Sequence, residues 1–347
     1  MDFDAAFEDK TKYGTKLKTD EYKKQGKYLI VDQGQELIAG YTNKEVGFFS
    51  ELPVIIFGDH TRIIKYIDKP FYIGADGVKI LRCKLQNPNY KYLFYALKNV
   101  HIPNTGYNRH FKWLKQSSIK YPDSVTQNRI AQILDTVSDI IQLRKSELNQ
   151  LDELIKARFV EMFGDLRINS KGWEIKVFDE LSSLITDGEH ATPRRTSEGI
   201  YLLSARNVLN HSLQLDDVDY IDQDEYDRIA KRVVPQEGDV LISCSGTVGR
   251  CCSVPANLKF QMVRSAALIR FNEEINPVFA EYMITSDYLQ EQINSSKTAS
   301  SQANLFQGKI KVLKGFVPPI ELQNEFVMFV AQIDKSKVIE KISPRLH

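Results

Sequence analysis

The chain lacks features that mark several large classes of protein. No apolar run approaches the roughly 18 residues that a membrane span requires, and the acidic start of the chain has no basic or apolar signal-peptide region. The four cysteines (Cys83, Cys244, Cys251 and Cys252) include no Cys-x-x-Cys pair, and no histidine pair accompanies them at metal-ligand spacing. These absences predict a cytoplasmic protein with reduced structural thiols, no membrane contact and no metal site.

Acidic residues are missing from long stretches, although the 347 residues carry a formal net charge of only +1. No acid lies between Asp76 and Asp123, and residues 241–272 and 292–320 are also acid-free, while acids gather between Asp216 and Asp227. Because phosphate attraction depends on the local field, this segregation predicts a polyanion-facing surface in each half of the chain. A solvated basic face without a partner is the alternative.

A short signature occurs twice and divides the chain. Pro122 is followed after four residues by Gln127-Asn128, and Pro318 is followed in the same way by Gln323-Asn324. Short strand-like segments, a helix and a polar loop precede each copy, and an apolar periodic segment follows it. The sequence therefore predicts two similar halves, each a mixed domain with a helix at its end.

The two periodic segments predict long helices. Apolar residues keep a three-four spacing from Ile130 to Met162 and again from Leu322 to Ile342, after which Pro344 ends the second, shorter helix. A long helix with one apolar stripe needs a partner to cover it, so we expect an antiparallel coiled coil. Separate packing of each helix against its own domain is the alternative.

Several short motifs identify a family when they are taken together. In order they are Gly26-Lys27-Tyr28, residues 55–62, residues 104–111, Thr186-Asp187-Gly188, residues 203–208 and residues 238–250. With the duplicated plan, they make nearly the whole chain resemble the specificity subunit of type I restriction-modification systems. The resemblance implies an α+β fold in which two target recognition domains of strands and helices are joined by two long helices. The domains expected are target recognition domain 1 (1–126), a central spacer helix (127–165), target recognition domain 2 (166–320) and a short C-terminal spacer helix (321–347).

The resemblance also implies a function. Each target recognition domain would read one half of a split sequence in double-stranded DNA, while the helices would hold the halves apart and dock two modification (methyltransferase) subunits. Restriction (nuclease and translocase) subunits are expected as further partners. The chain itself would be non-catalytic and hold no cofactor. S-adenosylmethionine, ATP and Mg are expected on the partner subunits.

Candidate DNA-binding residues lie in loops and carry side chains that can reach base edges or phosphates. In the first domain they are His60, Arg62, Tyr107, Asn108, Arg109 and His110, with Lys112 and Lys115 for phosphates. In the second domain they are Arg194, Arg195, Arg206, Asn207, Ser245, Thr247, Arg250, Gln302 and Asn304, with Lys309 and Lys311 for phosphates. A side chain that only caps a turn is the alternative for each of them.

Two other classes of function compete with DNA reading by a non-catalytic subunit. Asn87-Pro88-Asn89-Tyr90 differs at one position from the Asn-Pro-Pro-Tyr motif of amino-methyltransferases, but no glycine-rich cofactor loop follows a strand upstream of it. The segment from Gly246 to Cys251 lacks the Lys-Ser/Thr of a phosphate-binding loop, which argues against ATP hydrolysis. The second competing class, after an enzyme, is a scaffold whose coiled coil and domains bind only proteins.

Overall fold

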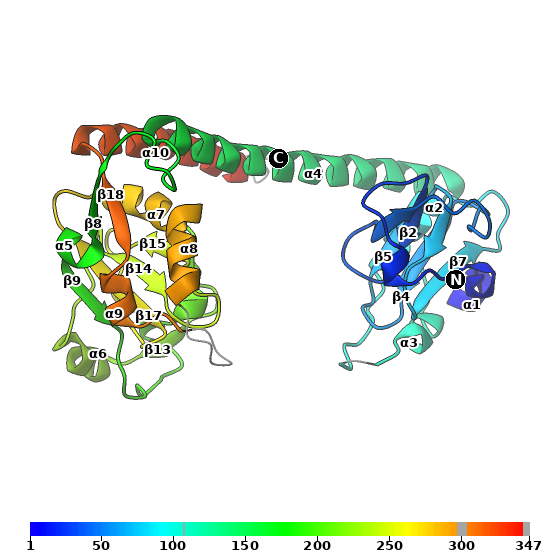
Figure 1. Ribbon diagram of the computed structural model, residues 1–347. Coiled ribbons are helices and arrows are strands. Elements are labelled where there is room, and N and C mark those ends of the chain that lie inside the picture. Colours follow the sequence, from blue (N-terminus) through cyan, green and yellow to red (C-terminus); the bar gives the residue numbers. More distant parts are fainter. Residues whose placement is uncertain (107, 297–303, 343–347) are drawn as a thin grey trace. The chain divides into compact units, whose positions relative to one another are not determined.

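The computed structural model describes residues 1–106, 108–296 and 304–342. The chain divides into two compact units, Met1–Arg144 and Lys145–His347, called unit 1 and unit 2 (Figure 1). Within the described residues, no helix is both long and apolar enough to cross a membrane.

Unit 1 is built from short strands and helices. Its strands are β1 (Phe7–Asp9), β2 (Tyr28–Val31), β3 (Gly40–Thr42), β4 (Val54–Gly58), β5 (Ile64–Ile67), β6 (Phe71–Ile73) and β7 (Val78–Cys83). Its short helices are α1 (Phe3–Ala6), η1 (Thr11–Tyr13), η2 (Thr19–Glu21), α2 (Tyr90–Lys98) and α3 (Phe111–Lys115). One antiparallel sheet has the strand order β1-β7-β4-β5. The other has the order β3-β2-β6, with β2 parallel to β6 and antiparallel to β3.

Unit 2 is larger. Its strands are β8 (Glu174–Val177), β9 (Ser182–Asp187), β10 (Ile200–Leu203), β11 (Val208–Leu209), β12 (Ser212–Leu213), β13 (Asp219–Ile221), β14 (Val240–Ser243), β15 (Cys251–Ser253), β16 (Phe260–Met262), β17 (Ala266–Phe271) and β18 (Lys314–Val317). Its short helices are α5 (Phe178–Leu181), η3 (Ala205–Asn207), α6 (Gln223–Ala230), α7 (Pro277–Thr285), α8 (Asp287–Ser296) and α9 (Gln307–Lys311).

The two units share one topology. The sheet β9-β17-β14-β15 of unit 2 repeats the order β1-β7-β4-β5, again with antiparallel neighbours. The sheet β13-β10-β16 repeats β3-β2-β6, and its central strand is likewise parallel to one neighbour and antiparallel to the other. The predicted plan of two similar mixed domains is therefore confirmed at the level of strand pairing.

Strand side chains alternate between two apolar layers in each unit, as expected for a sheet that is covered on both faces. In β4, Ile55 and Phe57 belong to the layer formed with α1, α2 and α3, whereas Val54 and Ile56 belong to the layer formed with β2 and β6. The same alternation recurs in β14, where Ile242 faces α7 and Leu241 faces β10 and β16. The central strand is thus buried on both sides, and polar side chains are left to the loops at its ends.

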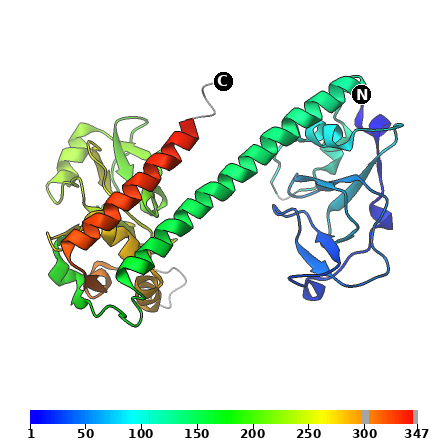
Figure 2. The same ribbon diagram turned by 90° about the horizontal axis from the view of Figure 1, so that it is seen from above.

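Two long helices confirm the prediction from the periodic segments. Helix α4 spans Ser124–Phe163 and α10 spans Ile320–Ile342, so α10 is the shorter helix and ends where the apolar pattern ends. Within unit 2, Phe326 packs against Phe159 with ring centroids 5.3 Å apart, whereas Lys337 pairs with Asp152 at 2.7 Å. Later residues of α10 therefore meet earlier residues of α4, which confirms antiparallel pairing (Figure 2).

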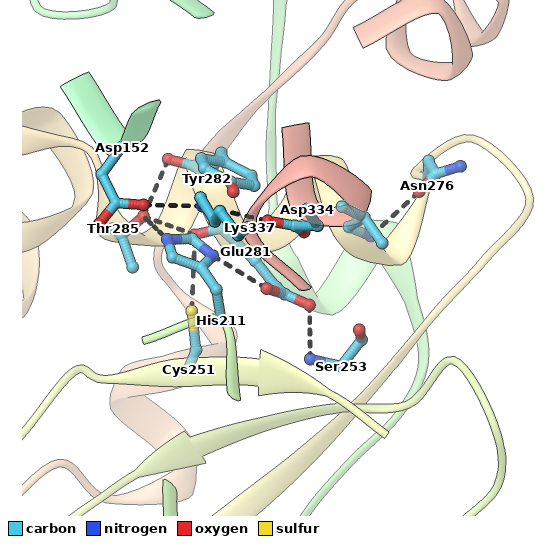
Figure 3. Close-up of polar contacts among 11 residues, drawn as sticks. Asp152, His211, Cys251, Ser253, Asn276, Glu281, Tyr282, Thr285, Asp334 and Lys337 are labelled. Carbon is cyan, nitrogen blue, oxygen red and sulfur yellow. Dashed lines mark hydrogen bonds and ion pairs between the residues drawn. The ribbon is translucent and has the colours of Figure 1, made fainter. Parts of the chain in front are cut away.

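The helix pair also packs on the body of unit 2 through α7 (Figure 3). Tyr282 lies between Phe326 of α10 and His211 of the β11–β12 turn, with ring centroids 5.1 and 4.0 Å away. The neighbouring Glu281 is buried and accepts hydrogen bonds from His211 Nδ1 (2.9 Å) and the Ser253 backbone N–H (2.6 Å). Burial raises the pKa of Tyr282, and the carboxylates of Asp334, Glu281 and Asp152 raise it further, so its hydroxyl stays neutral.

The duplicated Pro-x4-Gln-Asn signature forms the same joint in both units. Gln127 Nε2 donates to Pro122 O and Gln323 Nε2 donates to Pro318 O, each at 2.8 Å, and both glutamines are buried. In each unit, the asparagine that follows the glutamine accepts a hydrogen bond from the asparagine that caps an earlier short helix, α2 in unit 1 and α7 in unit 2. Asn128 thus accepts from Asn89 at 2.7 Å, and Asn324 accepts from Asn276 at 2.8 Å. The signature therefore fixes how each long helix leaves its domain.

Candidate nucleic-acid interface

In unit 1, the loops after β2 and β4, before β7 and before α3 come together. Asp59, which is 2% exposed, holds them: its backbone N–H donates to Gly77 O at 2.7 Å, and its Oδ1 accepts from the Phe111 N–H at 2.7 Å. Gln33 after β2 accepts from the His60 N–H at 3.1 Å and donates to Asp76 O at 3.0 Å. Because these hydrogen bonds tie four loops from distant parts of the sequence to one another, the loop cluster is a platform for polar side chains.

The predicted residues of unit 1 are placed unequally on this platform. Asn108 and Arg109 are exposed, and His60 and Arg62 are half-buried, with Arg62 Nη1 donating to Ile102 O at 3.2 Å. Tyr107 lies outside the described residues. His110 is fully buried, and both its backbone N–H (2.8 Å) and its Nδ1 (3.0 Å) bond to Asp59 O, which argues against direct contact with DNA.

The segment of unit 1 between Asp76 and Asp123, which is an acid-free window in the sequence, has acidic residues from other segments close to it in space. Lys79, Arg82 and Lys91 of this window pair with Asp9, Glu51 and Asp135, which come from other segments. Lys112 and Lys115 of α3 are exposed and have no ion pair with any residue that the structure describes. Lys112, Lys115 and Arg109 therefore place positive charge beside the loop cluster that no described residue offsets by an ion pair, while Lys84, Lys98 and Lys120 carry such charge elsewhere on the unit.

Unit 2 builds an equivalent loop cluster at the end of β14. The Cys244 N–H donates to Ser265 O at 2.7 Å, as the Asp59 N–H does to Gly77 O, and the Leu305 N–H donates to Cys244 O at 2.8 Å. Ser245 forms a bridge with Asn304, and Arg250 Nη2 donates to Ala205 O at 2.8 Å. Two predicted residues, Ser245 and Asn304, thus meet here, and Thr247 and Arg250 lie in the turn that follows β14. Gln302 lies outside the described residues.

A hollow of about 490 Å³ opens within this cluster. Polar and aromatic groups line it: Asp187, His190, Ser245, Arg264, Asn304 and Phe306. The buried Cys244 thiol also borders it, and burial raises the pKa of that thiol to about 12, so the thiol is neutral at pH 7. The prediction of DNA-binding residues missed Asp187, His190 and Arg264, although Arg264 lies in an acid-free window and Asp187 in the Thr-Asp-Gly motif.

The three predicted arginines that come before β14 in the chain are occupied by intramolecular ion pairs. Arg195 and Arg206 share Asp219 at 2.9 Å each, and Arg194 pairs with Asp222 at 2.7 Å. Strand β13 pairs with β10 and brings the acidic segment beside these arginines, an approach that charge counting along the sequence could not reveal.

The other predicted residues of unit 2 are Asn207 and two lysines of α9, Lys309 and Lys311. Asn207 is fully buried and donates to Gln214 O and Asp217 O at 2.9 Å each, so its role is to hold the loop after η3. Lys309 is exposed, whereas Lys311 pairs with Asp179 at 2.9 Å.

The residues that resemble a methyltransferase motif serve the fold. Asn89 caps α2 by accepting from the Tyr92 N–H at 2.8 Å, and the Tyr90 hydroxyl accepts from the Cys83 N–H at 3.0 Å. All four cysteines are free and buried, as predicted. In the described part of the chain, no cluster of three or more His, Cys, Asp or Glu side chains could hold a metal ion.

Comparison with known proteins gives one consistent family. Residues 8–153 match the model of the type I restriction modification DNA specificity domain. The chain is 22% identical to the type I restriction enzyme EcoR124I/EcoR124II specificity subunit of Escherichia coli, over 94% of this chain and 84% of that one.

Solved structures agree at the level of the fold. The S subunit of a type I restriction-modification system from M. genitalium matches with a TM-score of 0.60 at 17% identity, over 99% of this chain and 91% of that one. A structure from a study of assembly and conformational transition of the type I system matches with a TM-score of 0.50 at 14% identity, over 91% and 86%. Residues 8–153 therefore match the DNA specificity domain of type I restriction-modification systems, and nearly the whole chain is similar to specificity subunits of such systems.

Proposed function

We propose that this chain reads a bipartite sequence in double-stranded DNA, with one recognition domain for each half. Recognition domain 1 would comprise residues 1–126 and recognition domain 2 residues 166–320. The observation that carries the proposal is the duplication of one topology, with an equivalent loop cluster at the end of β4 and of β14. Two copies of one reader with different loop residues suit a target made of two different half-sites.

The exposed side chains of each cluster suit base edges and phosphates. In unit 1, Asn108 and Arg109 would reach bases, with Lys112 and Lys115 on phosphates. In unit 2, Ser245, Thr247 and Asn304 would lie nearest the DNA, with Lys309 on a phosphate. Arg62 and Arg250 donate to loop carbonyls and would hold the readers in place.

The long helix supports a role in recruiting partners. Ile133, Val137, Ile140 and Ile141 lie on one face of α4 and remain 45–53% exposed. An apolar stripe of this kind favours a protein partner. Because the joint between domain and helix occurs twice, we infer that two modification subunits dock, one near each joint. They would supply S-adenosylmethionine chemistry, and restriction subunits would supply ATP- and Mg-dependent cleavage.

Salt-dependent DNA binding tests the proposal against a purely protein-binding scaffold. Replacing Arg109, Lys112 and Lys115 by alanine in the complex with the modification subunit should lower the slope of log K against log salt by about 2, because the two phosphate contacts, from Lys112 and Lys115, contribute about 0.9 each. The matched control is Lys91→Ala, since Lys91 already pairs with Asp135 at 3.3 Å. Equal slopes for wild type and the triple variant would contradict DNA reading by unit 1.

Methyl transfer by the chain alone tests the enzymatic alternative. We expect no binding of S-adenosylmethionine and no incorporation of labelled methyl groups into DNA without the modification subunit. Incorporation that depends on Asn87 and Tyr90 would overturn the assignment of a non-catalytic subunit.

A further inference from the structure

Arg264 differs from every other arginine that the structure describes in unit 2. The guanidinium groups of the others take part in hydrogen bonds or ion pairs with the fold: Arg158, Arg167, Arg194, Arg195, Arg206, Arg228, Arg232, Arg250 and Arg270. The Arg264 side chain is exposed, borders the hollow, and makes no such contact with the described residues. Within the part of the chain that the structure describes, none of its five donors is used by another residue.

The backbone that carries Arg264 is held rigidly. The Arg264 N–H donates to Glu189 O at 3.0 Å, and the Val263 N–H donates to Leu203 O at 2.9 Å. Gly188 lies so close to this turn that a Cβ on it would come within 2.5 Å of Met262 O and Val263 O. The glycine of the Thr-Asp-Gly motif thus permits a close approach that fixes the turn, so the backbone of Arg264 has a defined place beside the hollow.

The surroundings of Arg264 distinguish a base from a phosphate. Asp187 lines the same hollow with a carboxylate that is 19% exposed and lies 3.6 Å from His190 Nε2. A carboxylate repels a phosphate but accepts a hydrogen bond from the amino group of cytosine, while arginine donates to both acceptors of guanine. Phe306, which is 57% exposed at the rim, adds an apolar wall.

We propose that Arg264 is a specificity-determining residue of unit 2 that reads the guanine of one G·C pair, with Asp187 facing the paired cytosine. The inference rests on the proposed function and names the base class read at this point. In unit 1 the equivalent position, before Gly77, holds Asp76, which pairs with Lys16 at 2.7 Å. A guanine contact equivalent to that of Arg264 should therefore be missing from the half-site read by unit 1.

The test compares binding of the chain, in complex with its modification subunit, to duplexes that carry the motif methylated in its host. For Arg264→Ala, discrimination at one G·C position should fall about 5- to 160-fold, the loss of one bidentate pair, while the other positions stay discriminated. Arg264→Lys, which keeps the charge but not the fork, should lose most of this discrimination. Arg167→Ala, which removes an arginine paired with Asp165 on another loop, is the matched control and should change nothing.

A modified base tests the contact on the wild-type complex itself, where the folding of a variant has no influence. Replacing that guanine by 7-deazaguanine removes the N7 acceptor, so it should weaken binding by the wild type but not by Arg264→Ala. An unchanged motif for both Arg264 variants, or a uniform loss at all positions, would overturn the assignment of Arg264 while leaving the proposed function intact. If the wild-type complex showed no sequence preference, both proposals would fall together.

Discussion

The joint at the start of α10 should depend on one buried side chain, Gln323. Its amide Nε2 donates to Pro318 O (2.8 Å) and Glu274 O (2.9 Å), and its Oε1 accepts from the Asn276 N–H (2.9 Å). Gln323→Ala removes all three hydrogen bonds and leaves three main-chain groups without these partners. Gln127, its counterpart in unit 1, makes one such bond, to Pro122 O.

The expected cost follows from the number of bonds lost. A net contribution of about 1 kcal/mol per hydrogen bond, rising to about 2 where the remaining group is buried, gives a loss of about 3–6 kcal/mol for Gln323→Ala. The same reasoning gives about 1–2 kcal/mol for Gln127→Ala. The two variants are matched controls, because each removes the same side chain from the same signature.

The chain provides one fluorescent reporter for each unit. Its two tryptophans are Trp113 on α3 and Trp173, whose Nε1 donates to Phe163 O at 2.8 Å. Urea unfolding of single-tryptophan variants (Trp113→Phe or Trp173→Phe) therefore measures each unit separately. Gln323→Ala should lower the midpoint of the transition reported by Trp173 and leave that reported by Trp113 unchanged. A loss for Gln323→Ala no greater than that for Gln127→Ala would refute the reasoning.

Two further predictions concern the helix stripe and the buried thiols. Ile140→Glu should change the melting temperature little but weaken capture of the modification subunit, whereas Gln142→Glu on the far face of α4 should not; equal capture would contradict docking on the stripe. Burial raises the pKa of Cys244 and Cys252 to about 12, above the ordinary value near 9, so their contribution to stability is fully present below pH 9 and is lost as pH rises toward 12. The upper bound on this loss of stability is about 4 kcal/mol per thiol. The free energy of unfolding should therefore fall less steeply with rising pH in the Cys244→Ala and Cys252→Ala variants. An unchanged dependence on pH would contradict burial of the neutral thiols.

The long-range plan could be predicted from the sequence because it rests on repeated local patterns. The periodic stripe predicted a central helix over 127–165, and the structure has it at Ser124–Phe163, so the two ends differ by three and two residues. The Pro-x4-Gln-Asn signature predicted a duplicated joint, and the glutamine and asparagine bonds give its physical reason.

The site was predicted less well, because the partners of a side chain come from other segments. The pairing of β13 with β10 places Asp219 between Arg195 and Arg206, and neither strand reveals this in sequence. His110 resembled a base reader by its residue type and loop position, yet it anchors the loop through Asp59. Arg264 could be recognised only after the structure had shown which arginines were already occupied.

Methylation sequencing of the host genome, with and without the gene for this chain, tests the central claim most directly. Reading of a bipartite site predicts an interrupted motif with two half-sites, whose methylation disappears when the gene is deleted. The guanine read by Arg264 should lie in the half-site assigned to unit 2. A continuous motif, or a methylation pattern that survives deletion of the gene, would contradict the account.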